Sequence, residues 1–197
     1  MISSQFSELL LQSLEHERGG VLVYQAAIKC AVREDLRGEW EKYLSQTEEH
    51  VDALSNICEI FDIDPFTTTP GTQIVKSLGK ALVNAMETAL SAGNPQAAQI
   101  VAAECVVLAE TKDHLDWELL GEAAKQLEGD ERDAVSEAYE KIEEEEDEHL
   151  YHTQGWCREL WLESLGLEAE LPPPEEVDDV TSAVEAQEAK ESRQARH

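Results

Sequence analysis

Glutamate and histidine residues interrupt four otherwise apolar stripes of the sequence, and their types suit metal binding. Within each stripe, apolar residues recur at alternating steps of three and four, which is the core spacing of a helix bundle. The interruptions are Glu17, Thr47 with His50, Glu110 with His114, and Glu146 with His149. A lone buried carboxylate costs several kcal/mol unless it is paired or coordinated. Four coincident interruptions therefore indicate a common partner in the core.

The positions of these residues place them at matching heights in two helical hairpins. If a turn lies near residue 34, Glu17 lies 17 residues before it and His50 lies 16 after it. If another turn lies near residue 129, Glu110 lies 19 residues before it, and Glu146 and His149 lie 17 and 20 after it. At a rise of about 1.5 Å per residue, the residues of each hairpin reach nearly one level. Their side chains can therefore meet across the core.

Two metal ions are the partner that best suits these residue types. Carboxylates can bridge two cations, and imidazole supplies a nitrogen ligand for iron, manganese or zinc. Glu146 and His149 are three residues apart, so on a helix they point to the same side and can share one ion. We expect the site to consist of Glu17, His50, Glu110, His114, Glu146 and His149. For His114, a core histidine hydrogen-bonded to Glu110 or Thr47 is an equally good interpretation.

Long helices must position these residues, because Gly and Pro are sparse and the apolar spacing is helical. Breaks in the pattern predict long helices at 4–33, 36–61, 95–127 and 131–166, and a shorter one at 72–91. Short turns join the first two and the last two long helices, while the 62–94 connection can cross the length of a bundle. We therefore predict an all-α fold, a four-helix bundle with one long crossover that contains an extra short helix. An up-down-up-down bundle with an extra helix is the alternative.

Residues 1–170 are expected to form this bundle. From residue 171 onward the sequence has three consecutive prolines, no aromatic residue and few large apolar residues. Such a composition does not bury enough apolar surface to fold, so residues 171–197 are predicted to be an acidic tail that is disordered or loosely helical.

The stripe residues resemble the ferritin-like superfamily, the group of bacterioferritin, rubrerythrin and manganese catalase. That family uses a Glu from its first and third helices and Glu-x-x-His from its second and fourth. Glu17 matches the first position, His50 the histidine of the second, Glu110 the third, and Glu146 with His149 the fourth. The resemblance covers about residues 6–160. It implies a ferritin-like bundle and redox chemistry with dioxygen or peroxide, such as ferrous oxidation, peroxide removal or an oxidase reaction.

The second motif departs from the family pattern, because it reads TEEH and has Thr47 where the family has a Glu. A hydroxyl is a much weaker ligand, so the site has one carboxylate fewer. Three histidines and three glutamates can still hold two ions, with His114 compensating; a single-metal or unequal site is the alternative. A second hypothesis is a non-enzymatic helical interaction or stress protein that keeps the fold with a degenerate site. The absence of a CxxC…CxxC rubredoxin segment argues against a self-contained rubrerythrin.

The composition restricts the partners and the compartment that we expect. The formal net charge is −28, from 43 acidic and 15 basic residues, which argues against binding nucleic acid or an acidic membrane surface. No apolar run approaches the roughly 18 residues of a transmembrane helix, no cationic segment precedes the first apolar residues, and the four cysteines form no CxxC pair. We expect a cytoplasmic homo-oligomer, a dimer or larger, that binds two metal ions and a small oxidant. Iron is favoured over manganese, with zinc as an alternative.

Overall fold

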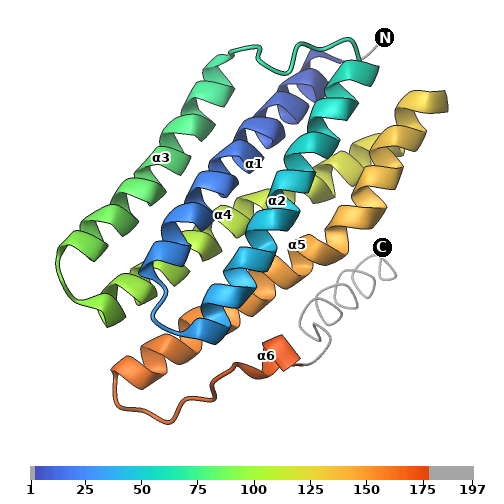
Figure 1. The fold of residues 1–197 in the computed structure, drawn as a ribbon. Coiled ribbons are helices and arrows are strands. Elements are labelled where there is room, and N and C mark those ends of the chain that lie inside the picture. The colour runs from blue at the N-terminus through green and yellow to red at the C-terminus, as the bar shows by residue number, and fades with distance from the viewer. Residues whose placement is uncertain (1–2, 178–197) are drawn as a thin grey trace, which may run out of the picture.

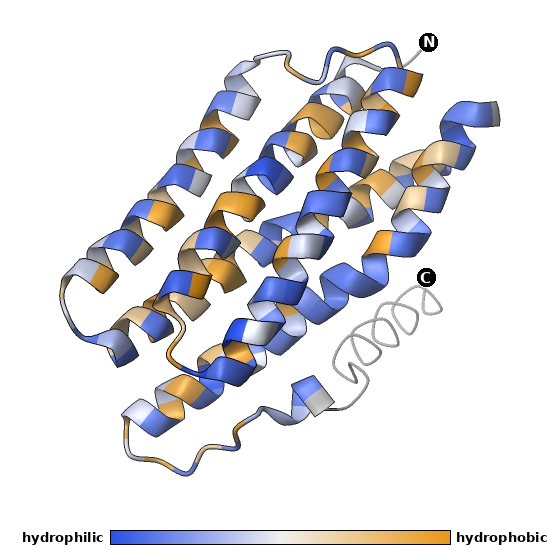
Figure 2. Cartoon of the chain, viewed as in Figure 1, coloured by the Kyte–Doolittle hydropathy of each residue, from blue (hydrophilic) through white to orange (hydrophobic). Residues whose placement is uncertain are grey.

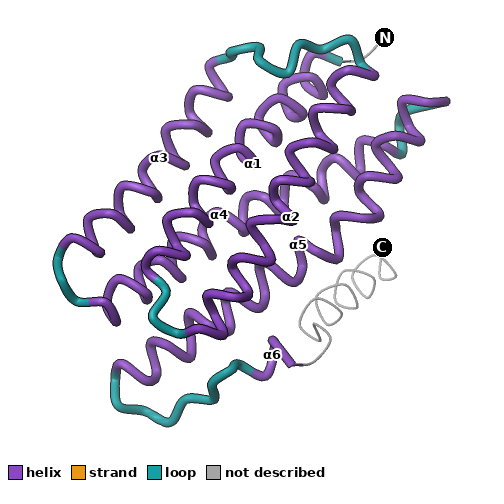
Figure 3. The backbone as a smooth tube through the Cα atoms, viewed as in Figure 1, coloured by secondary structure: helices purple, strands orange, loops and turns teal. Residues whose placement is uncertain are grey.

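The computed structural model describes residues 3–177, and every regular element in that range is a helix (Figure 3). The elements are α1 (Ser4–Cys30), α2 (Glu34–Ile60), α3 (Pro70–Ser91), α4 (Pro95–Ala124), α5 (Gly129–Ser164) and α6 (Pro174–Val177). The all-α class is therefore confirmed, and each of the five predicted helices begins and ends within three residues of its predicted bounds. No described helix is long and apolar enough to cross a membrane.

Four of the long helices lie side by side, and α3 lies outside them (Figure 1). Each of α1 and α5 packs against both α2 and α4. α2 runs back along α1 and α5 runs back along α4, so each pair forms an antiparallel hairpin (Figure 1). α3 travels the length of the group and packs against α1 and α4, and it thereby returns the chain to the end at which α4 begins (Figure 1).

Local signals in the sequence set where these helices begin. The side chain of Asn94 accepts a hydrogen bond from the backbone N–H of Ala97, and Pro95 fills the first turn of α4. At the start of α3, the Thr69 side chain accepts a hydrogen bond from the backbone N–H of Thr72, whose hydroxyl in turn accepts one from the Thr69 N–H. Such caps satisfy N–H groups that a helix start leaves without partners, and each contributes about 1 kcal/mol.

The core contains two apolar clusters, one toward each end of the bundle, with a polar layer between them. One cluster contains the buried Tyr24, Trp40 and Trp156, and the other contains the buried Leu54 and Trp117. Each long helix has apolar and hydrophilic positions along its length (Figure 2). Burial of each large apolar side chain contributes about 1.5–3 kcal/mol, so the two clusters hold the helices together on both sides of the polar layer.

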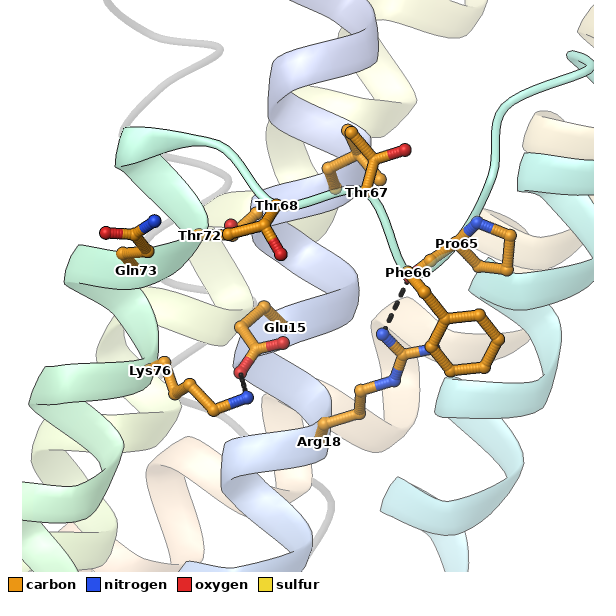
Figure 4. Close-up of a pocket in the computed structure, with 10 residues that line it drawn as sticks. Glu15, Arg18, Pro65, Phe66, Thr67, Thr68, Thr72, Gln73 and Lys76 are labelled. Atoms are coloured by element: carbon orange, nitrogen blue, oxygen red, sulfur yellow. Dashed lines mark hydrogen bonds and ion pairs between the residues drawn. The ribbon is translucent and has the colours of Figure 1, made fainter.

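The connection from α2 to α3 is held against α1 by Arg18, the residue after Glu17 (Figure 4). Its Nη1 donates a hydrogen bond to the Pro65 carbonyl at 2.8 Å, and its guanidinium carbon lies 4.9 Å from the centre of the Phe66 ring. Nearby, Lys76 on α3 pairs with Glu15 on α1 at 3.0 Å. These contacts border a surface pocket of about 300 Å³. They fix the start of the crossover next to the turn of α1 that carries Glu17.

Replacing Arg18 by Ala should therefore destabilise the crossover. A hydrogen bond from a charged donor and a stacked guanidinium together contribute about 1–3 kcal/mol. We expect the free energy of unfolding, measured by denaturant titration, to fall by about 1–2 kcal/mol on this scale. Arg132→Ala is the matched control, because Arg132 pairs only with its exposed neighbour Asp133 among the described residues. An equal loss in both variants would contradict the anchoring role.

The chain beyond α5 turns back and lies against that helix as far as Val177 (Figure 1). Arg158 pairs with Glu175 at 2.7 Å, and a Cβ atom placed on Gly155 would lie 3.2 Å from Pro173. Residues 171–177 therefore pack on α5 through an ion pair and a close approach at a glycine. The remainder of the predicted tail, 178–197, lies outside the described residues.

Candidate metal centre

Five of the six predicted ligands converge in the polar layer between the two apolar clusters. Glu17 comes from α1, His50 from α2, Glu110 from α4, and Glu146 with His149 from α5. Each is buried, with 2 % or less of its surface exposed. Because the antiparallel hairpins bring these positions to one height, the four helices deliver three carboxylates and two imidazoles to a single region.

Glu146 belongs to two groups of ligands at once. One ligand atom each of Glu17, His50 and Glu146 lie within 4.8 Å of one another, and the same is true of Glu110, Glu146 and His149. The Nδ1 atom of His50 is 3.0 Å from Glu146 Oε1, and the Nδ1 atom of His149 is 3.4 Å from that same oxygen. Glu17 and Glu110 complete the groups at 3.4 and 3.5 Å from their histidines. A carboxylate placed between two such groups is positioned to bridge two cations.

Several polar atoms inside this site lack hydrogen bonds. Six buried atoms of these five residues have no hydrogen-bond partner within residues 3–177: Glu17 Oε2, Glu110 Oε2, both carboxylate oxygens of Glu146, and the Nδ1 atoms of His50 and His149. The two Nδ1 atoms lie 3.0–3.5 Å from carboxylate oxygens of the site, which is ion-pair distance, but the groups are not aligned as a hydrogen bond requires. Unsatisfied buried polar groups are rare in folded proteins and costly, and a cation that accepts several of them as ligands removes that cost. The donor set therefore fits metal ions.

The outward nitrogen of each histidine is held by a side chain from a neighbouring helix. His50 Nε2 lies 2.8 Å from Glu145 Oε2, and His149 Nε2 lies 3.1 Å from Gln46 Oε1. Both partners are acceptor oxygens, so each Nε2 carries a hydrogen and donates it. This arrangement orients the two rings with Nδ1 toward the interior, as the supporting contacts of metal-bound histidines do. Trp117 similarly donates from Nε1 to Glu17 Oε1 at 2.7 Å.

The charges of the site depend on one another. Burial alone would lower the pKa of His50, but the nearby carboxylates of Glu146 and Glu17, at 3.0 and 3.4 Å from its Nδ1 atom, raise it to about 11. Burial would also lower the pKa of His149, but the carboxylates of Glu110 and Glu146 raise it to about 9. Burial would raise the pKa of Glu146, but its contacts with the two histidines lower it to about 2. Without metal, protons on the two imidazoles thus compensate two of the carboxylates, and metal ions would replace those protons.

The raised histidine pKa values make the stability of the metal-free protein depend on pH. Their contribution is complete below the unfolded-state pKa of about 6.5, and it is lost as pH rises through about 9 at His149 and about 11 at His50. Each histidine contributes about 1.4 kcal/mol per pH unit, so we expect the free energy of unfolding in chelator to fall by on the order of 2–3 kcal/mol per pH unit between about pH 7 and 9. Denaturant titrations across this range would measure it. A His50→Gln, His149→Gln double variant should have a flatter profile, and an unchanged slope would disprove the assignment.

Thr47 contributes no ligand to either group. Its side chain is buried, and its hydroxyl donates a hydrogen bond to the Tyr43 carbonyl one turn earlier at 2.9 Å. Its methyl group faces α1, because a Cβ atom placed on Gly20 would lie 3.2 Å from Thr47 Cγ2. The position at which the ferritin-like pattern has a Glu is therefore occupied by a side chain whose oxygen is satisfied by its own helix.

His114 is the predicted ligand that the structure does not bring to the site. Its Nε2 atom lies 2.8 Å from Asp147 Oδ1, and 19 % of its side chain is exposed. The expected hydrogen bond to Glu110 or Thr47 is also wrong, since Asp147 is the partner. The reason is the spacing of the buried residues along α4. The next buried residue after Glu110 is three positions along the helix, not four, so it is not His114.

The step of three places Asp113 in the core instead. Asp113 is buried and its Oδ1 atom has no hydrogen-bond partner. Burial raises the pKa of its carboxyl, and so does repulsion from Glu17, Glu146 and Glu110, which shows that it faces the same region. Sequence reasoning missed this residue, together with Gln46 and Glu145. For Asp113 the available signal was its three-residue spacing from Glu110, which is the spacing used for Glu146 and His149.

The candidate metal centre therefore consists of two buried groups of ligands that share Glu146, with Asp113 beside them. Comparisons with protein-family models, with curated proteins and with solved structures found no match to the chain.

Proposed function

We propose that this chain is a ferritin-like protein that holds two metal ions, iron or manganese, and carries out redox chemistry with dioxygen or peroxide. The observation that carries the proposal is Glu146, which is buried and shared by two groups of Glu and His ligands. The long crossover between two antiparallel hairpins, occupied here by α3, also supports it, because this connectivity is the one the resemblance predicts.

Each residue has a distinct role in this proposal. Glu17 and His50 would hold one ion, Glu110 and His149 the other, and Glu146 would contact both. Asp113 lies beside both groups, and its pKa is raised by burial and by the neighbouring carboxylates. Glu145 and Gln46 keep the two imidazoles oriented through their Nε2 atoms.

When bound, a pair of iron or manganese ions would supply electrons for the reduction of dioxygen or peroxide. The chain itself controls water and protons around that chemistry. The apolar clusters on both sides exclude bulk water from the polar layer. Burial, together with the charges of Glu110 and Glu146, raises the pKa of Tyr24, so its hydroxyl keeps its proton and remains a donor beside the carboxylates.

The ligand set favours iron or manganese because it consists of carboxylate oxygens and imidazole nitrogens. Among the described residues, the two groups that fit a metal ion contain no cysteine thiol. Thiolates would favour zinc or an iron–sulfur cluster. Zinc remains the alternative for a site with histidine ligands.

Metal analysis of the purified protein tests the proposal most directly. After anaerobic reconstitution with ferrous iron or with manganese(II), we expect two ions per chain, and the loaded protein should consume dioxygen or peroxide. A chain that binds no metal would disprove the proposal. Light scattering of the same sample would test the homo-oligomer that the resemblance implies.

A second candidate is a non-enzymatic helical interaction or stress protein with a degenerate or single-metal site. Thr47 favours it, because the hydroxyl that replaces the expected carboxylate is bonded to the Tyr43 carbonyl. In that case the chain should bind one ion or none and stay folded in chelator. It should also retain a specific protein partner under those conditions and show no oxidant consumption.

A further inference from the structure

An apolar hollow lies between α1, α3 and α4, outside the ring of metal ligands. Its volume is about 280 Å³, and its walls are mostly aliphatic side chains from all three helices, among them Val23, Val75, Leu82 and Leu108. Two glycines form part of the wall where α1 and α3 approach each other. A Cβ atom placed on Gly79 would lie 3.5 Å from the Cα atom of Gly19. The missing side chains at these positions leave space between the helices.

The floor of the hollow is the reverse side of the candidate metal centre. His16 precedes Glu17 on α1, and Ala109 precedes Glu110 on α4. His16 Nε2 lies 3.0 Å from the Ala109 carbonyl oxygen, so the ring donates a hydrogen bond that joins α1 to α4 behind the two carboxylates. A molecule in the hollow would therefore rest on the two helical turns that present Glu17 and Glu110 to the core.

The polar groups of the hollow already have partners, which determines the kind of molecule it suits. The Nε2–H group of His16 already donates a hydrogen bond to the Ala109 carbonyl oxygen. The ammonium group of Lys112 pairs with Asp116. No charge in the lining needs a ligand to balance it, so the hollow favours an uncharged, apolar molecule.

Size decides between a small molecule and a segment of protein. A volume of about 280 Å³ is just below the usual range of about 300–1,000 Å³ for small-molecule pockets, and it is too small for a helix. Leu78 and Leu108 also line the hollow and are 55 % and 63 % exposed, so they form an apolar entrance at the protein surface. We propose that this hollow binds a small uncharged apolar molecule, such as a medium-chain alcohol. The inference does not depend on the proposed metal centre, and metal-free protein is sufficient to test it.

The test is a titration of the methyl-labelled, metal-free full chain with 1-octanol, followed by NMR. We expect saturable shifts of the Leu78, Leu82 and Leu108 methyl groups, while Leu54 in the apolar cluster toward the other end stays unchanged. Shifts that are absent, or that are spread equally over both regions, would overturn the proposal. The proposal would also be overturned if the Leu78 and Leu108 methyl signals shifted on protein dilution but not on addition of octanol. This face would then be a contact between copies of the chain.

Two variants locate the binding. In Gly79→Leu the new Cβ atom fits at ordinary contact distance and the longer side chain fills the hollow, so octanol affinity should fall at least about tenfold. Gly38→Leu is the matched control, because nothing lies within 4 Å of a Cβ atom there, and it should bind octanol like the parent chain. Leu108→Glu places a charge at the exposed entrance without disturbing the core, and it should also weaken binding. Parent-like affinity in Leu108→Glu would overturn the proposal even if Gly79→Leu failed to fold.

Discussion

Glu146→Gln is expected to abolish tight binding of both metal ions, although it changes only one side chain. Glu146 is the single residue that belongs to both ligand groups, with one of its oxygens 3.0 Å from His50 Nδ1 and 3.4 Å from His149 Nδ1. The amide keeps the shape of the side chain but removes the negative charge that two cations would share. We expect affinity for each ion to fall by more than about 100-fold, since the loss of a contact that only supports a ligand already costs 10–100-fold.

Metal content after reconstitution and dialysis, measured by elemental analysis, checks this result. Glu144→Gln is the matched control, because Glu144 lies two residues earlier on α5 with an exposed side chain. It should keep the metal content of the parent chain. Glu17→Gln and Glu110→Gln should each weaken mainly one ion, since each residue belongs to one group. If Glu146→Gln lost only one ion, the shared role of Glu146 would be refuted.

Thr47→Glu should have opposite effects in the metal-free and metal-loaded protein. Without metal, it adds a fifth carboxyl group to the buried Glu17, Glu110, Asp113 and Glu146, with no further cation to balance it. An uncompensated buried charge destabilises by about 3–5 kcal/mol, so the variant should unfold at lower denaturant in chelator. With metal, the new carboxylate becomes a ligand and should raise both affinity and stability, because binding to the folded state alone stabilises it.

Unfolding titrations of Thr47→Glu in chelator and in saturating ferrous iron or manganese(II) would reveal this reversal. The methyl group of Thr47 packs closely against Gly20, where a Cβ atom would lie 3.2 Å from Thr47 Cγ2, so a longer side chain at position 47 also has a steric effect that needs a control. Thr47→Gln matches the size of Glu without its charge. It separates steric effects from electrostatic ones. If Glu and Gln behaved alike at position 47 in the presence of metal, this position would lie outside reach of any bound ion, and the single-metal alternative would gain support.

Much of the fold and of the candidate site could be predicted because the relevant signals are local or periodic. Capping residues such as Asn94 and the prolines that follow them mark helix starts, so the helix bounds required no tertiary information. Glu17, His50, Glu110, Glu146 and His149 were recognisable because charged residues in an apolar stripe must be buried with a partner. Their matching distances from the two turns indicated that they meet.

Only the tertiary structure decided which residues complete that layer. Trp117 is seven residues after Glu110. A helical stripe can join them through the third residue, Asp113, or through the fourth, His114, so spacing alone did not distinguish the two. The packing of α4 against its neighbours sets the rotation of the helix, which buries Asp113 and turns His114 toward Asp147. The sharing of Glu146 and the hollow behind Glu17 likewise depend on how separate helices approach one another. Sequence periodicity determines which face of a helix is apolar, but the rotation of the helix about its own axis, which decides whether a side chain or its neighbour is buried, is set by packing between helices.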